Sequence, residues 1–309
     1  MKLASILLFL SCWACSLGCD MPSVTAPTDP PGAVVPPDPP QDDPIQGPPV
    51  DMNNLWGFSA FRMSETPEAQ QRADLRYAQR RGYTFARICA ETVEWSGVLP
   101  PGSPLPQRVT ADVLLRRTLD IAAEEGMYVL VIPLCTVRDY GSEARREEWV
   151  RKVADILRGR DHVFAEAVNE PWHPRSLVSS ESLDRYIRIL KHAGIRTGAD
   201  EGFTRNGQWR YSQSALSDFP SAHPFRNPDP TKADLQKMVS MNGGWLLLSE
   251  TTCWADPNDN AELCTDSKEQ IQKYMDNCTQ IPGCFMVAHT REGLVGEPLT
   301  WLPIVQGTN

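Results

Sequence analysis

Short apolar segments alternate with amphipathic helical segments along residues 53–309, and this alternation constrains the fold more than any other feature. The segment at residues 128–132 is a β-branched run typical of a strand buried on both faces. Strands are expected at residues 56–60, 84–88, 128–132, 163–168, 195–199, 219–223, 245–249 and 284–288. Helices are expected at residues 67–81, 110–125, 143–158, 180–193, 231–241 and 267–277. Alternation of this kind implies parallel strands, and eight of them in about 250 residues imply a closed barrel.

The competing architecture is a doubly wound open sheet, which usually carries a glycine-rich turn after its first strand. No Gly-x-Gly-x-x-Gly follows residues 56–57, and no Gly-Lys-Ser/Thr loop occurs. The sequence therefore predicts the α/β class, as a (β/α)₈ TIM barrel forming a single domain over residues 53–309, after a proline-rich linker.

The N-terminus has the features of an export signal. Lys2 precedes a short apolar run at residues 3–10, and Gly18-Cys19 closes the segment in a way that resembles a bacterial lipobox. We expect residues 1–18 to be a lipoprotein-type signal peptide and Cys19 to be lipidated. The alternative is a simple secretory signal in which the cysteines are incidental.

Residues 19–52 form the expected linker. Eleven of the chain's 27 prolines lie between residues 20 and 50. Proline fixes φ and lacks an N–H, so this stretch favours an extended polyproline spacer between the anchor and the barrel. A disordered tail without a task is the alternative.

Charge and cysteine content narrow the partners and the compartment. The formal net charge of −9 argues against nucleic acid, since phosphate binding needs a basic face. No apolar run long enough to span a membrane follows the N-terminus, so membrane association is expected only through the lipid anchor. An even number of cysteines remains in the barrel, which allows disulfides in an exported protein. Short separations favour Cys253–Cys264 and Cys278–Cys284, whereas Cys89 and Cys135 could pair or stay free. No zinc pattern is present, so no metal site is expected.

Two strands end in a glutamate. Residues 163–168 lead into Asn169-Glu170-Pro171, and residues 245–249 lead into Glu250. In a barrel of this type the chemistry lies at the C-terminal ends of the strands, and strands four and seven face each other across the mouth. The two carboxylates are therefore expected to meet. Most glutamates are ordinary surface residues, and Glu166, inside the fourth strand, is the chief rival.

Residues 53–305 resemble the retaining glycoside hydrolases of clan A, most nearly the cellulase-like family 5. The residues that carry the resemblance arrive in the family's order at the ends of strands two, four, six and seven, and they are Arg87, Asn169-Glu170-Pro171, His223 and Glu250. The resemblance implies that Glu170 is the acid/base and Glu250 the nucleophile. It further suggests that Arg87 keeps Glu250 ionised through its charge and a bidentate hydrogen bond, although a core salt bridge to another acid is the plainer interpretation. Asn169 would contact a substrate hydroxyl or cap a turn, and His223 would orient Glu250, bind substrate or simply be buried.

The sequence departs from the family's pattern at two places. Phe225 stands where the family often has a tyrosine, for which Tyr211 is a substitute, and strand eight ends in His289-Thr290 rather than a tryptophan. Trp172 and Trp254 follow the two acids and, with His289, are candidates for contact with sugar rings, although loop-packing aromatics are equally common.

The resemblance implies an exported β-glycosidase or endo-glycanase that cleaves a β-linked poly- or oligosaccharide by double displacement. It would lie at the cell surface or in the periplasm as a lipoprotein, or otherwise be secreted. The protein is expected to be a monomer and to need no cofactor. The alternative is a cell-surface barrel that binds carbohydrate without turnover.

Overall fold

The computed structural model describes residues 44, 46–90, 111–135, 142–171, 178–202, 215–223, 230–250, 253–254 and 267–305. The chain divides into residues 1–42 and residues 43–309, and every described residue belongs to the second unit. The expected signal peptide and Cys19 lie outside the described residues. Within the described ranges, none of the helices combines the length and the apolarity that a membrane crossing requires.

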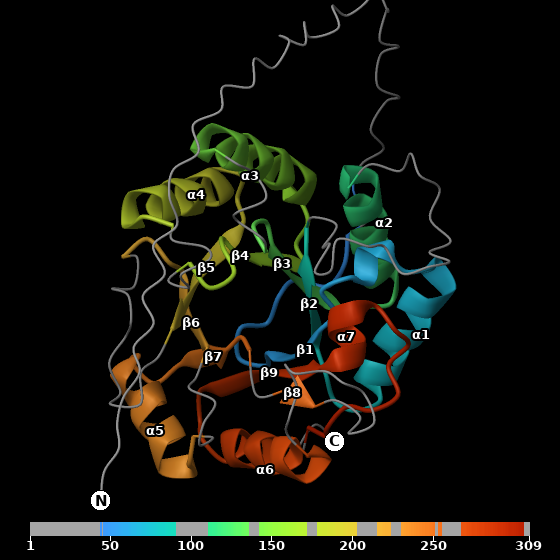
Figure 1. Ribbon diagram of the computed structural model, residues 1–309, viewed down its shortest axis with the longest axis vertical. Coiled ribbons are helices and arrows are strands. Elements are labelled where there is room, and N and C mark those ends of the chain that lie inside the picture. The colour runs from blue at the N-terminus through green and yellow to red at the C-terminus, as the bar shows by residue number, and fades with distance from the viewer. Residues whose placement is uncertain are drawn as a thin grey trace, which may run out of the picture. The chain divides into compact units, whose positions relative to one another are not determined.

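Eight parallel strands close into a barrel, as the sequence predicted (Figure 1). They are β1 (Trp56–Ser59), β2 (Phe85–Cys89), β3 (Tyr128–Ile132), β4 (Val163–Glu166), β5 (Arg196–Gly202), β6 (Phe219–His223), β7 (Leu246–Leu248) and β9 (Cys284–Thr290). Each strand pairs with the next, and β1 closes the ring by pairing with β9 in the register Gly57 with Val287. An additional two-residue strand, β8 (Cys253–Trp254), pairs with the end of β9.

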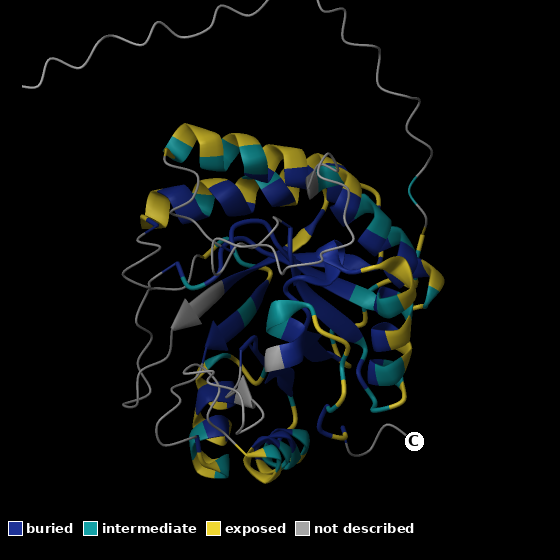
Figure 2. Cartoon of the chain, turned by 45° about the vertical axis from the view of Figure 1, so that its right-hand side comes forward, coloured by how far each residue is buried: buried dark blue, intermediate teal, exposed yellow. Residues whose placement is uncertain are grey.

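Helices surround the ring of strands (Figure 1). They are α1 (Glu68–Gln79), α2 (Ala111–Glu124), α3 (Glu143–Leu157), α4 (Ser180–His192), α5 (Lys232–Met241) and α6 (Lys268–Thr279), with a short η1 (Met63–Glu65) after β1 and α7 (Arg291–Val295) after β9. Figure 2 shows their buried faces turned towards the strands and their exposed faces outward. This is the division expected of amphipathic helices that cover a barrel.

Local sequence signals set the helix ends. Thr231 and Ser267 start α5 and α6 with reciprocal capping boxes, in which the side chains of Asp234 and Gln270 accept a hydrogen bond from the cap backbone N–H. After α4 the chain reverses at Gly194, whose φ of +83° is unfavourable for residues with a Cβ. These signals explain why the predicted helix bounds lie within a few residues of the observed ones.

An aromatic layer lies at the N-terminal end of the barrel. Its rings touch in a series with centroids between 5.2 and 6.1 Å apart, in the order Phe85, Phe164, Phe219, Trp245, Phe285 and Trp56. Gly57 and Gly198 make room for it, because a Cβ on either would come within 3.0 Å of the Phe85 or Phe219 ring. The layer therefore packs the end of the barrel opposite the predicted acids.

Two disulfides lie among the described residues. Cys278 pairs with Cys284, which confirms the prediction, and Cys89 at the end of β2 pairs with Cys135 after β3. The second bond joins two neighbouring strand ends near the predicted site. Cys264 lies outside the described residues, so the predicted Cys253–Cys264 bond stays a prediction.

Candidate active site

The predicted acids meet at the C-terminal end of the barrel. Glu170 follows β4 by four residues and Glu250 follows β7 by two, and parallel strands bring their C-terminal ends to one rim. His223 ends β6 and lies between the two carboxylates. Its Nδ1 is 3.0 Å from Glu170 Oε1, and its Nε2 is 3.1 Å from Glu250 Oε2.

The separation of the two acids is short. One carboxylate oxygen of Glu170, one of Glu250 and one ring nitrogen of His223 all lie within 4.8 Å of one another. Glu250 is buried, with 8% of its surface exposed, whereas the Glu170 side chain keeps 26% exposed. The pair therefore consists of one enclosed carboxylate and one that solvent or a ligand can reach.

Glu170 has a strained backbone. Its φ is +45°, and no other non-glycine residue in the described ranges has a positive φ. The residue before a proline is further restricted, because the ring of Pro171 clashes with it. Residues in such conformations typically cost about 1–3 kcal/mol and are held there by their surroundings. The strain belongs to the turn that sets where the Glu170 carboxylate sits beside His223.

Arg87 makes a different set of contacts from the one predicted. Its Nε donates to Glu166 Oε2 at 2.9 Å and its Nη2 donates to Asn169 Oδ1 at 3.0 Å. Its Nη1 lies 3.6 Å from Glu250 Oε2, so an ion pair replaces the predicted bidentate hydrogen bond to Glu250. Arg87 therefore ties Glu166 at the end of β4 to Asn169 in the turn that follows, and it faces Glu250 with its positive charge.

Glu166, the predicted rival acid, is fully buried against Arg87. A carboxylate with no exposed surface cannot meet a substrate, so its part is structural. Its negative charge balances the buried Arg87 guanidinium. Burying that cation without an opposite charge would carry a large desolvation penalty.

Glu250 lies among three cationic or imidazole groups. Besides Arg87 and His223, His289 of β9 places its Nε2 3.7 Å from Glu250 Oε1. His289 in turn shares a hydrogen bond of 2.7 Å between its Nδ1 and the Ser59 hydroxyl at the end of β1. Phe61 packs beneath this group, since the Arg87 guanidinium lies over its ring at 5.1 Å and the His289 ring meets it edge-on at 5.5 Å.

The two acids and the histidine between them are also side chains of the kinds that bind divalent transition metals in proteins. Glu170, His223 and Glu250 offer two carboxylates and an imidazole within 4.8 Å of one another. Carboxylates that hold a cation cannot act at the same time as acid and nucleophile. The two uses of this cluster therefore compete.

Comparison with known proteins finds similar structures but no similar sequences. No protein-family model and no curated protein matches the chain. Among solved structures, a family 5 glycoside hydrolase from Bacteroides vulgatus is 10% identical, with a TM-score of 0.54 over 76% of this chain and 58% of that chain. A second protein from that organism is 13% identical, with a TM-score of 0.61 over 81% of this chain and 53% of that chain. A Thermotoga petrophila endo-1,4-β-D-mannanase is 13% identical, with a TM-score of 0.54 over 77% of this chain and 88% of that chain.

These similarities decide the fold. The chain has a (β/α)₈ barrel fold like that of glycoside hydrolase family 5. It spans little more than half the length of the two Bacteroides vulgatus chains. At these low identities the match concerns the arrangement of strands and helices.

The structure brings together six of the predicted site residues, which are Arg87, Asn169, Glu170, His223, Glu250 and His289. Trp172, Phe225 and Tyr211 lie outside the described residues, as does the side chain of Trp254. Sequence reasoning missed Ser59. A polar residue at the end of the first strand, after the apolar residues 56–58, was the available signal.

Proposed function

We propose that the protein hydrolyses β-glycosidic bonds of a poly- or oligosaccharide with retention of configuration. The observation that carries the proposal is the Glu170–Glu250 pair, whose nearest oxygens fall within 4.8 Å on either side of His223. Retaining enzymes hold their two carboxyl groups about 5–5.5 Å apart, whereas inverting enzymes leave about 6.5–9.5 Å for a water molecule. The shorter separation fits direct attack by a carboxylate.

In this mechanism Glu250 attacks the anomeric carbon and Glu170 protonates the leaving oxygen. The positive charge of Arg87, 3.6 Å away, favours the ionised form of Glu250. Glu170 is the more exposed of the two carboxyl groups, so it is the one that a leaving oxygen can reach. After the leaving group departs, Glu170 accepts a proton from water, which then releases the sugar from Glu250.

His223 and Asn169 support the two steps. His223 reaches both carboxylates, so it can fix their relative orientation in each step. Asn169 accepts from Arg87 through Oδ1, and that bond turns its amide NH₂ group away from the guanidinium and keeps it as a donor for a sugar hydroxyl.

The substrate we propose is a β-1,4-linked mannan or glucan. The mannanase fold match and the cellulase-like motif order support this choice. Export as a lipoprotein through Cys19 stays part of the proposal, because it would bring the barrel to polysaccharide outside the cell.

The test is product analysis on both polysaccharides. Wild type should release new reducing ends, and proton NMR of the first product should show the anomer of the substrate. Glu250→Ala should abolish turnover. Glu170→Ala should lose about 10²–10⁴-fold on unactivated substrates, retain the first step on aryl glycosides and be accelerated by azide. Glu181→Gln, on the outer surface of α4, is the matched control.

Two results would contradict the proposal. An inverted first product would remove Glu250 from the role of nucleophile. Binding of the polysaccharide without cleavage would favour a carbohydrate-binding barrel. The His289 that stands in place of a tryptophan suggests this alternative.

A further inference from the structure

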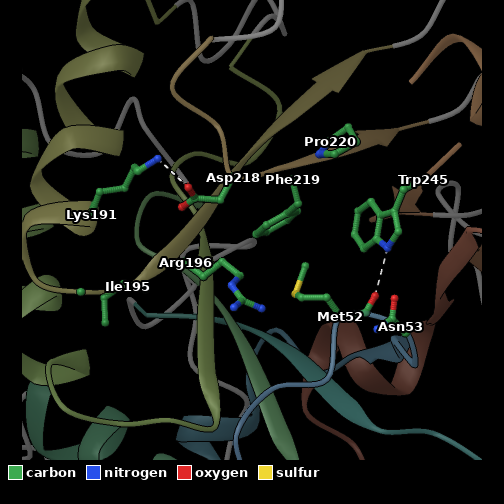
Figure 3. Close-up of a pocket in the computed structure, with 10 residues that line it drawn as sticks. Met52, Asn53, Lys191, Ile195, Arg196, Asp218, Phe219, Pro220 and Trp245 are labelled. Carbon is green, nitrogen blue, oxygen red and sulfur yellow. Dashed lines mark hydrogen bonds and ion pairs between the residues drawn. The ribbon is translucent and has the colours of Figure 1, made fainter. Parts of the chain in front are cut away.

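A pocket opens at the end of the barrel opposite the acids. Its volume is about 730 Å³, within the size range of small-molecule sites. It is lined by residues at the starts of β5, β6 and β7 and by the segment before β1, among them Arg196, Phe219, Pro220, Trp245, Met52 and Asn53. Figure 3 shows these side chains bordering one space.

The pocket is positively charged, although the chain as a whole is negative. Lys191 pairs with Asp218 at 2.5 Å, and the other Asp218 oxygen accepts from the Thr197 backbone at 2.9 Å. Arg196 is exposed, and within the described ranges its guanidinium has neither an ion pair nor a hydrogen bond. Lys191 and Arg196 are positive and Asp218 is negative, so the lining of the pocket has a net charge of +1, whereas the whole chain has a net charge of −9. An anionic group is the natural complement of Arg196.

One wall of the pocket is flat, apolar and rigid. The Trp245 indole donates from Nε1 to the Met52 carbonyl at 3.0 Å, which fixes the orientation of the ring. The ring also packs on Phe285 at 5.3 Å and Phe219 at 6.1 Å within the aromatic layer. Trp245 and Pro220 nevertheless keep part of their surfaces exposed. A ligand with a flat C–H face can therefore stack here without rearranging the wall.

We propose that this pocket is a second carbohydrate-binding site, specific for a uronic acid unit of an acidic oligosaccharide. The inference rests on the proposed function, because that function brings the protein to polysaccharide. The uronate carboxylate would accept a paired hydrogen bond from Arg196, and its hydroxyls would meet the Asp218 carboxylate and the Asn53 amide. The pyranose C–H face would lie on Trp245. A neutral sugar leaves Arg196 without a partner.

The test measures binding separately from catalysis. The probe is trigalacturonate, with cellotriose as the neutral comparison, titrated calorimetrically into the whole protein carrying Glu250→Gln. We expect trigalacturonate to bind and Arg196→Ala to raise its Kd about 10-fold or more, since charge-assisted hydrogen bonds are the strong ones. Arg188→Ala, an exposed arginine of α4, should leave the Kd unchanged. Arg196→Lys should restore part of the affinity, and added salt should weaken binding.

Three outcomes overturn the inference: trigalacturonate does not bind, Arg196→Ala binds it as well as the parent, or cellotriose binds equally well. Binding in the catalytic cleft would be recognised by its indifference to Arg196→Ala. Failure of the proposed function would appear separately, as wild type that cleaves no polysaccharide while Arg196-dependent binding persists.

Discussion

His162 gives the protein a pH-dependent stability that can be measured without any substrate. The imidazole is fully buried immediately before β4. Its Nε2 donates to the Leu119 carbonyl oxygen at 3.1 Å, and its Nδ1 accepts from the Gly47 backbone N–H at 3.2 Å. A single neutral tautomer satisfies both contacts. Protonation of Nδ1 would place two donors against each other and detach the segment that leads into the barrel.

The size of the effect follows from the pKa of His162. Burial is the main cause that lowers this pKa from 6.5 to about 4; the nearby Arg160 charge adds to it, and the hydrogen bond to Leu119 opposes it. The unfolded chain therefore takes up the proton at higher pH than the folded one. The stabilisation is complete above about pH 6.5 and is lost as the pH falls towards about 4. The difference corresponds to about 3 kcal/mol of unfolding free energy.

The assay is urea unfolding of wild type and His162→Gln between about pH 4 and about pH 8, followed by tryptophan fluorescence. Glutamine keeps an N–H donor for Leu119, and any constant cost of the substitution cancels when differences are compared across pH. The advantage of wild type over the variant should grow by about 3 kcal/mol from the acid to the neutral end. His192→Gln, at an exposed histidine, is the control. A wild-type advantage that stays constant over this range would refute the reasoning.

Three further outcomes are expected. Burial raises the pKa of Asp74 to about 6, so its charge destabilises the fold as the pH rises through that value; Asp74→Asn should gain about 2–3 kcal/mol near pH 8 and nothing near pH 4, by urea unfolding. Replacing both cysteines of Cys89–Cys135, which lie 46 residues apart, should cost about 4 kcal/mol of unfolding free energy in the same assay. Ser59→Ala should lower kcat about 10-fold with KM and the unfolding midpoint unchanged, because His289 loses the hydroxyl that holds it beside Glu250, the proposed nucleophile; an unchanged kcat would remove Ser59 from the site.

The barrel could be predicted because periodicity and strand alternation are local properties of the sequence. The exceptions are elements defined by their neighbours. β5 extends to Gly202, beyond the expected end at residue 199, because pairing with β6 continues to the register of Gly202 with His223. β8 is two residues long and is defined by its pairing with the end of β9. Neither element has an apolar pattern of its own.

The acids of the site were predictable from their place after strands, whereas their partners were not. Arg87 was expected to bond Glu250, with a core salt bridge to another acid as the alternative, and the structure shows such a buried salt bridge to Glu166. The Ser59–His289 bond joins residues 230 positions apart and exists only because the first and last strands pair. Such contacts follow from closure of the barrel, which no local pattern specifies.

The aromatic layer limits how early in folding the barrel can close. Trp56 in the first strand packs on Phe285 in the last, so the layer joins residues 285 minus 56, or 229, positions apart. During synthesis Trp56 lacks this neighbour until residue 285 has emerged from the ribosome. Closing so long a loop is slow and unfavourable until the contacts that reward it form. The barrel can therefore close only after β9 has been synthesised, and chains interrupted before β9 would leave the Trp56 indole without this contact and more prone to aggregation.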